Sequence, residues 1–291
     1  MKPIVITPMI TPFGTDGKID FDMTGHLLKR LSGFGVDGVF PLGSTGVFPW
    51  ISFEEKKSLL GYVAEYSGSM EVYAGSASPN VEECIELARM ALDFDCDYAI
   101  ILPPYYIAPS VEGMGSFFSR ILGSVDIKFM LYNIPQNTGS TIPVDLIEAL
   151  KREHSNLAGI KDSSGDMRYH ERLLRFKSKD FRILQGQDDL FMQSVLLGSN
   201  GGICGTTNLV PQVTRIAQLV ENGDIAEATR IQLEEVNPLM DALNSAKFPS
   251  GYYYGFYRSS GFNGGYRLPM VEPKPDTARR IDAVLSEMGQ E

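Results

Sequence analysis

Short apolar runs recur along the chain, and longer segments in which apolar and polar residues alternate with a helical period separate them. Near-continuous apolar character is typical of strands that are covered on both faces, as in a parallel sheet. The intervals between the runs leave room for one helix and its loops, so the pattern predicts eight strand–helix units. The predicted strands are residues 4–6, 38–40, 72–74, 98–102, 129–131, 158–160, 182–184 and 202–204.

Three of the intervening segments begin with residues that favour the first turn of a helix. Ser52 and Asn80 stand close before pairs of glutamates, and their side chains can accept a hydrogen bond from an unpaired helical amide. Pro143 opens another amphipathic segment, where a proline in the first turn costs no hydrogen bond. These signals support helices between the strands.

Eight strand–helix units predict an α/β fold, the (β/α)8 TIM barrel, over residues 1–222. The competing doubly wound sheet would carry a glycine-rich phosphate-binding turn after its first strand, but residues 7–12 contain two prolines and no glycine. The barrel is therefore the expected architecture.

The pattern changes after the eighth strand, where only helices are predicted. These cover about residues 211–222, 224–245 and 275–288, which indicates a C-terminal helical region at residues 223–291. Between the last two helices lie residues 251–266, which are rich in glycine and tyrosine. We expect them to form a loop packed against the barrel.

Charge and the absence of long apolar runs narrow the possible partners. The formal net charge is −10 and the pI is about 4.9, so nucleic acid and anionic membranes would repel the chain on average. Prolines interrupt the first apolar stretch before it could serve as the core of a signal peptide, and no run approaches the length of a membrane span. We expect a cytoplasmic protein that contacts neither nucleic acid nor a membrane.

Cysteine and histidine give no sign of a metal centre. The three cysteines are scattered, which suits buried thiols in a reducing compartment. The three histidines, His26, His154 and His170, lie in predicted helices or their flanks, and none has a second ligand at a suitable spacing. No metal is expected.

The candidate chemistry stands where predicted strands end. Lys161 closes one apolar run, Tyr132 follows another, and the turn Gly43-Ser44-Thr45-Gly46 follows a third. The carboxyl ends of all barrel strands lie on one face, so these groups should converge. A lysine amine can condense with a ketone, a phenol hydrogen-bonded to Ser44 or Thr45 can move protons, and a glycine turn can present amides to a carboxylate.

Each feature has an ordinary alternative when it is taken alone. A lysine at a strand end is more often a salt-bridge partner, here of Asp162, and Tyr132 alone is more often a packed aromatic residue. A glycine turn of this kind is a weak signal. The lysine, the tyrosine and the glycine turn together are a stronger signal than any one of them.

In combination with further motifs, the chain resembles the dihydrodipicolinate synthase and N-acetylneuraminate lyase family over essentially its whole length. The resemblance rests on four motifs in this order and spacing: Gly43-Ser44-Thr45-Gly46, Pro104-Tyr105-Tyr106, Leu131-Tyr132-Asn133-Ile134-Pro135 and Gly159-Ile160-Lys161-Asp162.

The resemblance implies a set of site residues. Lys161 would form a Schiff base with pyruvate, Tyr132 would transfer the proton, and Ser44 and Tyr106 would complete a hydroxyl relay. The position of Tyr106 commonly reaches across a subunit interface in the family, which implies a homotetramer built as a dimer of dimers. The substrate-binding residues would be Gly43, Thr45, Gly46, Asn137, Ser163, Gly186, Gln187, Asp188 and Ile203.

Departures from the family pattern bear on the substrate. Dihydrodipicolinate synthases usually carry an arginine two residues after the proline of the Y-N-x-P motif, where it grips a second carboxylate; this chain has Asn137, whose neutral amide cannot do so. Residues 47–50 replace a segment in which many members carry glutamate. Residues 185–189 offer amides and carboxylates suited to sugar hydroxyls. Together with residues 197–198 and 208–212, this region resembles the 2-keto-3-deoxygluconate aldolases of the family more than its lysine-biosynthetic branch.

The leading hypothesis is a class I aldolase, without cofactor or metal, that cleaves a 2-keto-3-deoxy sugar acid into pyruvate and an aldehyde. Its partners would be a small keto acid, an aldehyde and further copies of the chain. The alternatives with related chemistry are 4-hydroxy-tetrahydrodipicolinate synthase, N-acetylneuraminate lyase and a sugar-acid dehydratase. An alternative of a different class is an inactive barrel that only binds a keto acid.

Overall fold

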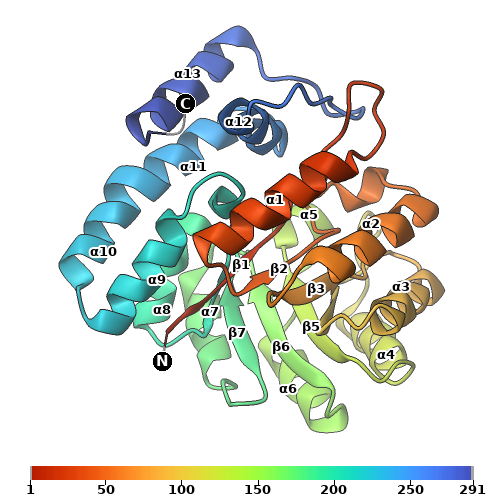
Figure 1. Ribbon diagram of the computed structural model, residues 1–291. Helices are drawn as coiled ribbons and strands as arrows, with labels where there is room; N and C mark the ends of the chain where they lie inside the picture. The colour runs from red at the N-terminus through yellow and green to blue at the C-terminus, as the bar shows by residue number, and fades with distance from the viewer. Residues whose placement is uncertain (1, 290–291) are drawn as a thin grey trace.

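The computed structural model describes residues 2–289. Eight parallel strands form a closed barrel in which each strand pairs with the next and β8 pairs with β1 (Figure 1). The predicted (β/α)8 fold is confirmed, and each predicted strand overlaps an observed one. The strands are β1 (Ile4–Thr7), β2 (Gly38–Val39), β3 (Glu71–Gly75), β4 (Tyr98–Ile101), β5 (Lys128–Asn133), β6 (Leu157–Asp162), β7 (Arg182–Gln185) and β8 (Gly201–Ile203).

Helices surround the barrel, and two of the predicted helix starts are confirmed. Ser52 forms a full capping box with Glu55, and the Asn80 side chain accepts hydrogen bonds from two amides of the next turn. Pro143 stands one residue before its helix, at the N-cap, rather than within the first turn. The helices that follow the strands are α1 (Phe21–Phe34), α2 (Phe53–Tyr66), α3 (Val81–Asp93), α4 (Val111–Leu122), α5 (Pro135–Thr138), α6 (Val144–Glu153), α7 (Met167–Leu174), α8 (Phe191–Leu196) and α9 (Gln212–Asn222).

Side chains close the barrel at the amino ends of its strands. Arg182 at the start of β7 forms an ion pair of 2.6 Å with Glu71 at the start of β3. These strands stand opposite each other in an eight-stranded barrel, so the pair crosses the interior. The stacked rings of Tyr73 and Tyr98, 4.5 Å apart, lie beside it. Any site built into the barrel must therefore open at the carboxyl ends.

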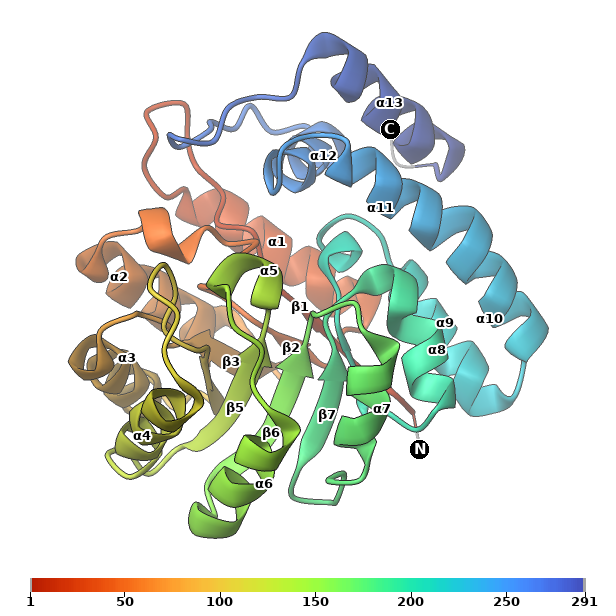
Figure 2. The same ribbon diagram turned by 180° about the vertical axis from the view of Figure 1, so that it is seen from behind.

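The C-terminal helices cover that end of the barrel on one side. Figure 2 shows α11 (Asn237–Asn244) and α12 (Ser250–Ser260) near the short helix α5, at the end toward which the strands point. A π-helical segment at residues 232–236 joins the first two helices of the C-terminal region, α10 (Ile225–Ile231) and α11. The elements are α10 (Ile225–Ile231), α11 (Asn237–Asn244), α12 (Ser250–Ser260) and α13 (Pro275–Glu287).

The predicted loop at residues 251–266 is wrong over most of its length, because residues 250–260 form helix α12. Tyr253 and Tyr257 lie one helical turn apart, and their hydroxyl oxygens accept hydrogen bonds from the amides of Thr11 and Phe13. A Cβ on Gly251 would stand 2.1 Å from a backbone oxygen of α11, so close helix packing explains that glycine. Tertiary contacts outweigh the low helix propensity of glycine here.

No helix within residues 2–289 combines the length and the apolar character needed to cross a membrane.

Candidate active site

A cavity of about 280 Å³ opens at the carboxyl ends of the strands. It brings together ten of the thirteen predicted site residues, from the turn after β2, the ends of β5, β6 and β8, and the segments that follow β5, β6 and β7. Those ten are Ser44, Thr45, Tyr132, Asn137, Lys161, Ser163, Gly186, Gln187, Asp188 and Ile203.

Lys161 lies inside the barrel near the end of β6 and is 4% exposed. Its Nζ stands 4.2 Å from the ring centroid of Tyr132 and 5.0 Å from that of Phe40. Among residues 2–289 it has no carboxylate partner within salt-bridge distance, and Asp162 pairs with His170 instead. The interpretation of Lys161 as a salt-bridge partner of Asp162 is therefore wrong.

Tyr132 is the direct neighbour of Lys161 across the β5–β6 pairing. Its ring is buried and meets Phe40 edge-on at 6.2 Å. Within the described part of the chain its hydroxyl makes no hydrogen bond, so the expected bond to Ser44 or Thr45 is absent. The phenol remains available to a bound molecule.

The two glycines of the turn after β2, Gly43 and Gly46, allow the turn to pack closely against its neighbours. A Cβ on Gly46 would stand 2.8 Å from the Met9 carbonyl oxygen, and Thr11 donates a hydrogen bond to the Gly46 carbonyl at 2.8 Å. Gly43 is pressed against the Phe40 ring in the same way. Neither glycine lines the cavity. They allow the turn to bring Ser44 and Thr45 to its wall, and within residues 2–289 the amides of these two residues donate to no acceptor.

Two glutamines are fixed at the cavity wall by one carbonyl group. The side-chain amides of Gln136 and Gln187 donate to the Ser163 carbonyl oxygen at 2.8 and 3.3 Å. A carbonyl oxygen only accepts, so each side chain turns its NH2 group toward it and its own oxygen elsewhere. The Ser163 hydroxyl is buried and has no protein partner among the described residues. These groups suit a ligand with hydroxyls.

Asp188 lines the cavity, but its carboxylate holds the loop after β8. It accepts hydrogen bonds from the amides of Gly205 and Thr206 at 2.9 and 2.7 Å, and from the Thr206 hydroxyl at 2.6 Å. Burial raises the pKa of the Asp188 carboxyl group. We expected this carboxylate to bind sugar hydroxyls, but in the structure both of its oxygens accept hydrogen bonds from within the protein.

Several lining residues were missed from the sequence. Gln136 stands directly before Asn137, so the same segment could have suggested it. The others come chiefly from the C-terminal helices, whose inward faces are set by packing and not by any local motif. The missed residues are Pro8, Ile134, Gln136, Gly205, Met240, Asn244, Phe248 and Tyr252.

Tyr106 is the predicted site residue that the family resemblance places at a subunit interface. It is 97% exposed and does not line the cavity of its own chain. A second cavity of about 320 Å³ adjoins the first and shares four lining residues with it, namely Ser44, Ile134, Asn137 and Phe248. Tyr105 lines this second cavity, and burial raises the pKa of its phenol to about 12.

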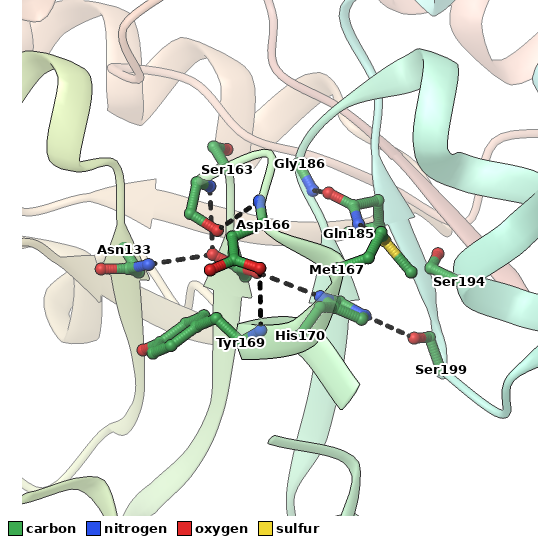
Figure 3. A network of polar contacts seen from close by, with 12 residues as sticks. Asn133, Ser163, Asp166, Met167, Tyr169, His170, Gln185, Gly186, Ser194 and Ser199 are labelled. Carbon is green, nitrogen blue, oxygen red and sulfur yellow. Dashed lines mark hydrogen bonds and ion pairs between the residues drawn. The ribbon is translucent and has the colours of Figure 1, made fainter. Parts of the chain in front are cut away.

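The described residues contain no cluster of three side chains that could hold a metal ion. His26 packs edge-on against Phe262, and His170 is buried in the hydrogen-bond network drawn in Figure 3. The three cysteines are buried free thiols, as predicted.

The fold and cavity define a (β/α)8-barrel protein with an amine, a phenol and a hydroxyl at the face where enzymes of this fold carry their active sites. A profile of the Dihydrodipicolinate synthetase family matches residues 3–288. The chain belongs to this family, and it is accordingly a pyruvate-dependent lyase.

Two relatives and one solved structure illustrate the similarity. An uncharacterized DapA-like lyase of Thermoplasma acidophilum is 47% identical over 98% of this chain and 97% of its own length. A 2-dehydro-3-deoxy-D-gluconate/2-dehydro-3-deoxy-phosphogluconate aldolase of Picrophilus torridus is 40% identical over 90% of this chain and 97% of its own. The structure of a 2-keto 3-deoxygluconate aldolase from the same organism superposes with a TM-score of 0.91 and 39% identity, covering 94% of this chain and 99% of the other.

Proposed function

We propose that the protein is a class I, Schiff-base aldolase that cleaves a 2-keto-3-deoxy sugar acid, such as 2-keto-3-deoxygluconate, into pyruvate and an aldehyde. The observation that carries the proposal is the position of Lys161, the one basic side chain among the residues lining the cavity, against the ring of Tyr132. An amine without a carboxylate partner beside a phenol suits attack on a ketone. The Picrophilus aldolase adds support.

The reaction follows from these groups. Lys161 Nζ attacks the C2 carbonyl carbon of the keto acid, water leaves, and an iminium ion forms. The C4 hydroxyl loses its proton as the C3–C4 bond breaks, which releases the aldehyde and leaves an enamine. Protonation of the enamine at C3 restores the iminium ion. Water then hydrolyses it to pyruvate and free Lys161.

Tyr132 is the proposed proton carrier. Its phenol lies beside the Lys161 amine, lines the same cavity and has no hydrogen bond within residues 2–289. It can give its proton to the hydroxyl that leaves as water when the iminium ion forms, and the resulting phenolate can then accept the C4 hydroxyl proton and return it to C3. Ser44 lines the cavity as the hydroxyl through which protons would pass on.

The two halves of the substrate would meet different parts of the wall. The keto-acid carboxylate would bind the amides of Ser44 and Thr45, which have no acceptor in the described chain. The hydroxyl-bearing half would meet the Ser163 hydroxyl and the side-chain oxygens of Gln136 and Gln187. No cofactor takes part in this scheme.

The leading alternative, 4-hydroxy-tetrahydrodipicolinate synthase, keeps Lys161 and changes the second substrate to aspartate semialdehyde. That substrate carries a second carboxylate, and the cavity offers the neutral amide of Asn137 where an arginine would grip it. An N-acetylneuraminate lyase or a sugar-acid dehydratase would share the iminium ion and differ in product. An inactive keto-acid-binding barrel would have no use for an amine at the carbonyl carbon.

Covalent trapping tests the central claim. The protein incubated with pyruvate and borohydride should gain the mass of one reduced pyruvate, and Lys161→Ala should gain none. Lys128→Ala is the matched control, because Lys128 begins β5 at the opposite end of the barrel and its variant should still be trapped. A modified Lys161→Ala variant would contradict the assignment. Product analysis on keto-deoxy sugar acids, aspartate semialdehyde and sialic acid then selects among the alternatives.

The proposal includes the assembly of several copies into a homotetramer. Tyr106 is almost fully exposed and does not line its own cavity, and the side chains of Ile107 and Val111 nearby in the chain are also exposed. A second copy would bury this apolar surface and would place Tyr106 at the neighbouring site.

A further inference from the structure

A buried polar network joins the ends of β5 and β6, the strands that carry Tyr132 and Lys161. Figure 3 shows Asn133, His170 and Ser199 of this network. Asn133 pairs with Asp162 in the register position that follows the pairing of Tyr132 with Lys161. Successive side chains of a strand point to opposite faces, so one pair faces the cavity and the next faces the surrounding helices. Asn133 and Asp162 are 0% and 1% exposed.

Hydrogen bonds join the two strand ends across this outer face. The Asn133 side-chain amide donates to Asp162 Oδ1 at 2.9 Å, and its oxygen accepts from the Ile142 amide at 3.0 Å. The Ser164 amide donates to the same Asp162 oxygen at 3.1 Å. The contact to Ile142 also fixes the far end of the segment that contains α5 and the cavity residues after β5.

His170 of α7 completes the network and has no exposed surface. Its Nδ1 stands 3.2 Å from Asp162 Oδ2, and because a carboxylate oxygen accepts, Nδ1 carries the proton. Its Nε2 lies 2.7 Å from the hydroxyl of Ser199, which stands just before β8. A buried carboxylate is unfavourable without donors, and His170 supplies the donor for the oxygen that Asn133 leaves free.

We propose that His170 is a positioning residue for the reaction: by holding Asp162, and through it Asn133, it keeps Lys161 and Tyr132 aligned on the opposite face of the same two strands. The inference rests on the proposed function of that pair. Chemistry between an amine, a substrate and a phenol is sensitive to small displacements, and a misplacement of about 1 Å can lower a rate about 100-fold.

Two amide substitutions separate this role from simple packing. In His170→Asn the side-chain nitrogen falls near the position of Nδ1 and can still donate to Asp162, whereas in His170→Gln it falls near Nε2 and contacts Ser199 instead. Both variants replace the ring by one neutral amide, so they share the loss of packing. They differ in which neighbour keeps its hydrogen bond.

The measurements are kcat and KM of the cleavage reaction and the thermal unfolding midpoint. For His170→Gln we expect kcat to fall about 10- to 100-fold with KM for the sugar acid little changed, and for His170→Asn a kcat within a few-fold of the parent. Equal kcat values in the two variants, or a parent-like kcat in His170→Gln, would overturn the inference.

A second variant decides the matter if His170→Gln does not fold. Asn133→Ser removes the bridging amide and leaves the contact between His170 and Asp162, and its kcat should fall at least 10-fold while KM stays close to the parent's. A parent-like kcat there would likewise overturn the inference. Trapping of the parent by pyruvate and borohydride distinguishes a failure of the proposed function from a failure of the role of His170. A parent that gains no mass would contradict the proposed function itself. A trapped parent whose variants are fully active would contradict only the role of His170.

Discussion

Side-chain alternation along β5 and β6 decides which residues face the cavity. Tyr132 and Lys161 are neighbours across the pairing and point inward, and the residues after them point outward into the polar network. A shift of one residue in this register would exchange the two sets. The hydrogen bonds on the outer face and the aromatic contacts on the inner face therefore support the same alignment.

Removal of the Tyr132 hydroxyl tests the proton carrier. Tyr132→Phe keeps the buried ring and its contact with Phe40, so the thermal unfolding midpoint should change little. The borohydride trapping of pyruvate should persist, while kcat falls by about 10² to 10⁴, the usual scale for a positioned proton donor. Turnover within a few-fold of the parent would show that another group moves the proton.

Asn137 is the position that should separate sugar acids from aspartate semialdehyde. In Asn137→Arg a guanidinium group would enter the cavity wall, and kcat/KM for condensation of pyruvate with aspartate semialdehyde should rise about 10-fold or more relative to glyceraldehyde. Pyruvate trapping should be unaffected, which serves as the control. If the parent already condenses the semialdehyde faster than glyceraldehyde, the sugar-acid proposal fails and the dihydrodipicolinate synthase alternative takes its place.

At the scale of elements, the C-terminal segment is linked to the barrel through the start of α2. Arg267 forms an ion pair of 2.7 Å with Glu55, which is also the partner of Ser52 in the capping box. The hydrogen bond from Arg267 lowers the pKa of Glu55 from 4.5 to about 2. One carboxylate thus joins a helix cap to a segment more than two hundred residues later in the chain.

This linkage predicts how stability depends on pH. A carboxyl group whose pKa is lowered on folding stabilises the folded state above its unfolded pKa, and this contribution is lost as the pH falls through the folded value. The difference in unfolding midpoint between the parent and Glu55→Gln should therefore be largest above about pH 5 and shrink toward pH 2. A difference that stays constant over this range would mean that the charge of Glu55 contributes nothing.

Helix α12 shows the limit of local patterns at this scale. Its glycines and tyrosines are typical of a loop, yet Tyr253 and Tyr257 reach from one helix face to the amides that follow β1. The strands were predicted correctly because a strand that is buried on both faces has a near-continuous apolar sequence. Close packing between segments far apart in the chain produces no comparable local sequence pattern.

At the scale of the whole molecule, assembly and catalysis are expected to depend on each other. If Tyr106 completes the site of a neighbouring copy, Tyr106→Phe and Lys161→Ala should each be nearly inactive. A refolded equal mixture of the two variants should recover about a quarter of the parent's activity. The reason is that about half of randomly mixed dimers contain both variants, and each of these has one intact site of two. The measurement is activity of the mixture beside each variant alone. No recovery in a mixture whose subunits have exchanged would place Tyr106 outside the partner's site.

The sequence by itself determined the eight strand–helix units, the family and the motif residues at the strand ends, because hydrophobic period and short-range spacing are local properties. The division of the chain at residue 222 stays a prediction. Tertiary structure alone decided that the Asp188 carboxylate holds the loop after β8, and that α11 and α12 supply Met240, Asn244 and Tyr252 to the cavity wall. These features depend on contacts between distant segments, and such contacts exist only once the barrel has closed and the C-terminal helices have packed against it.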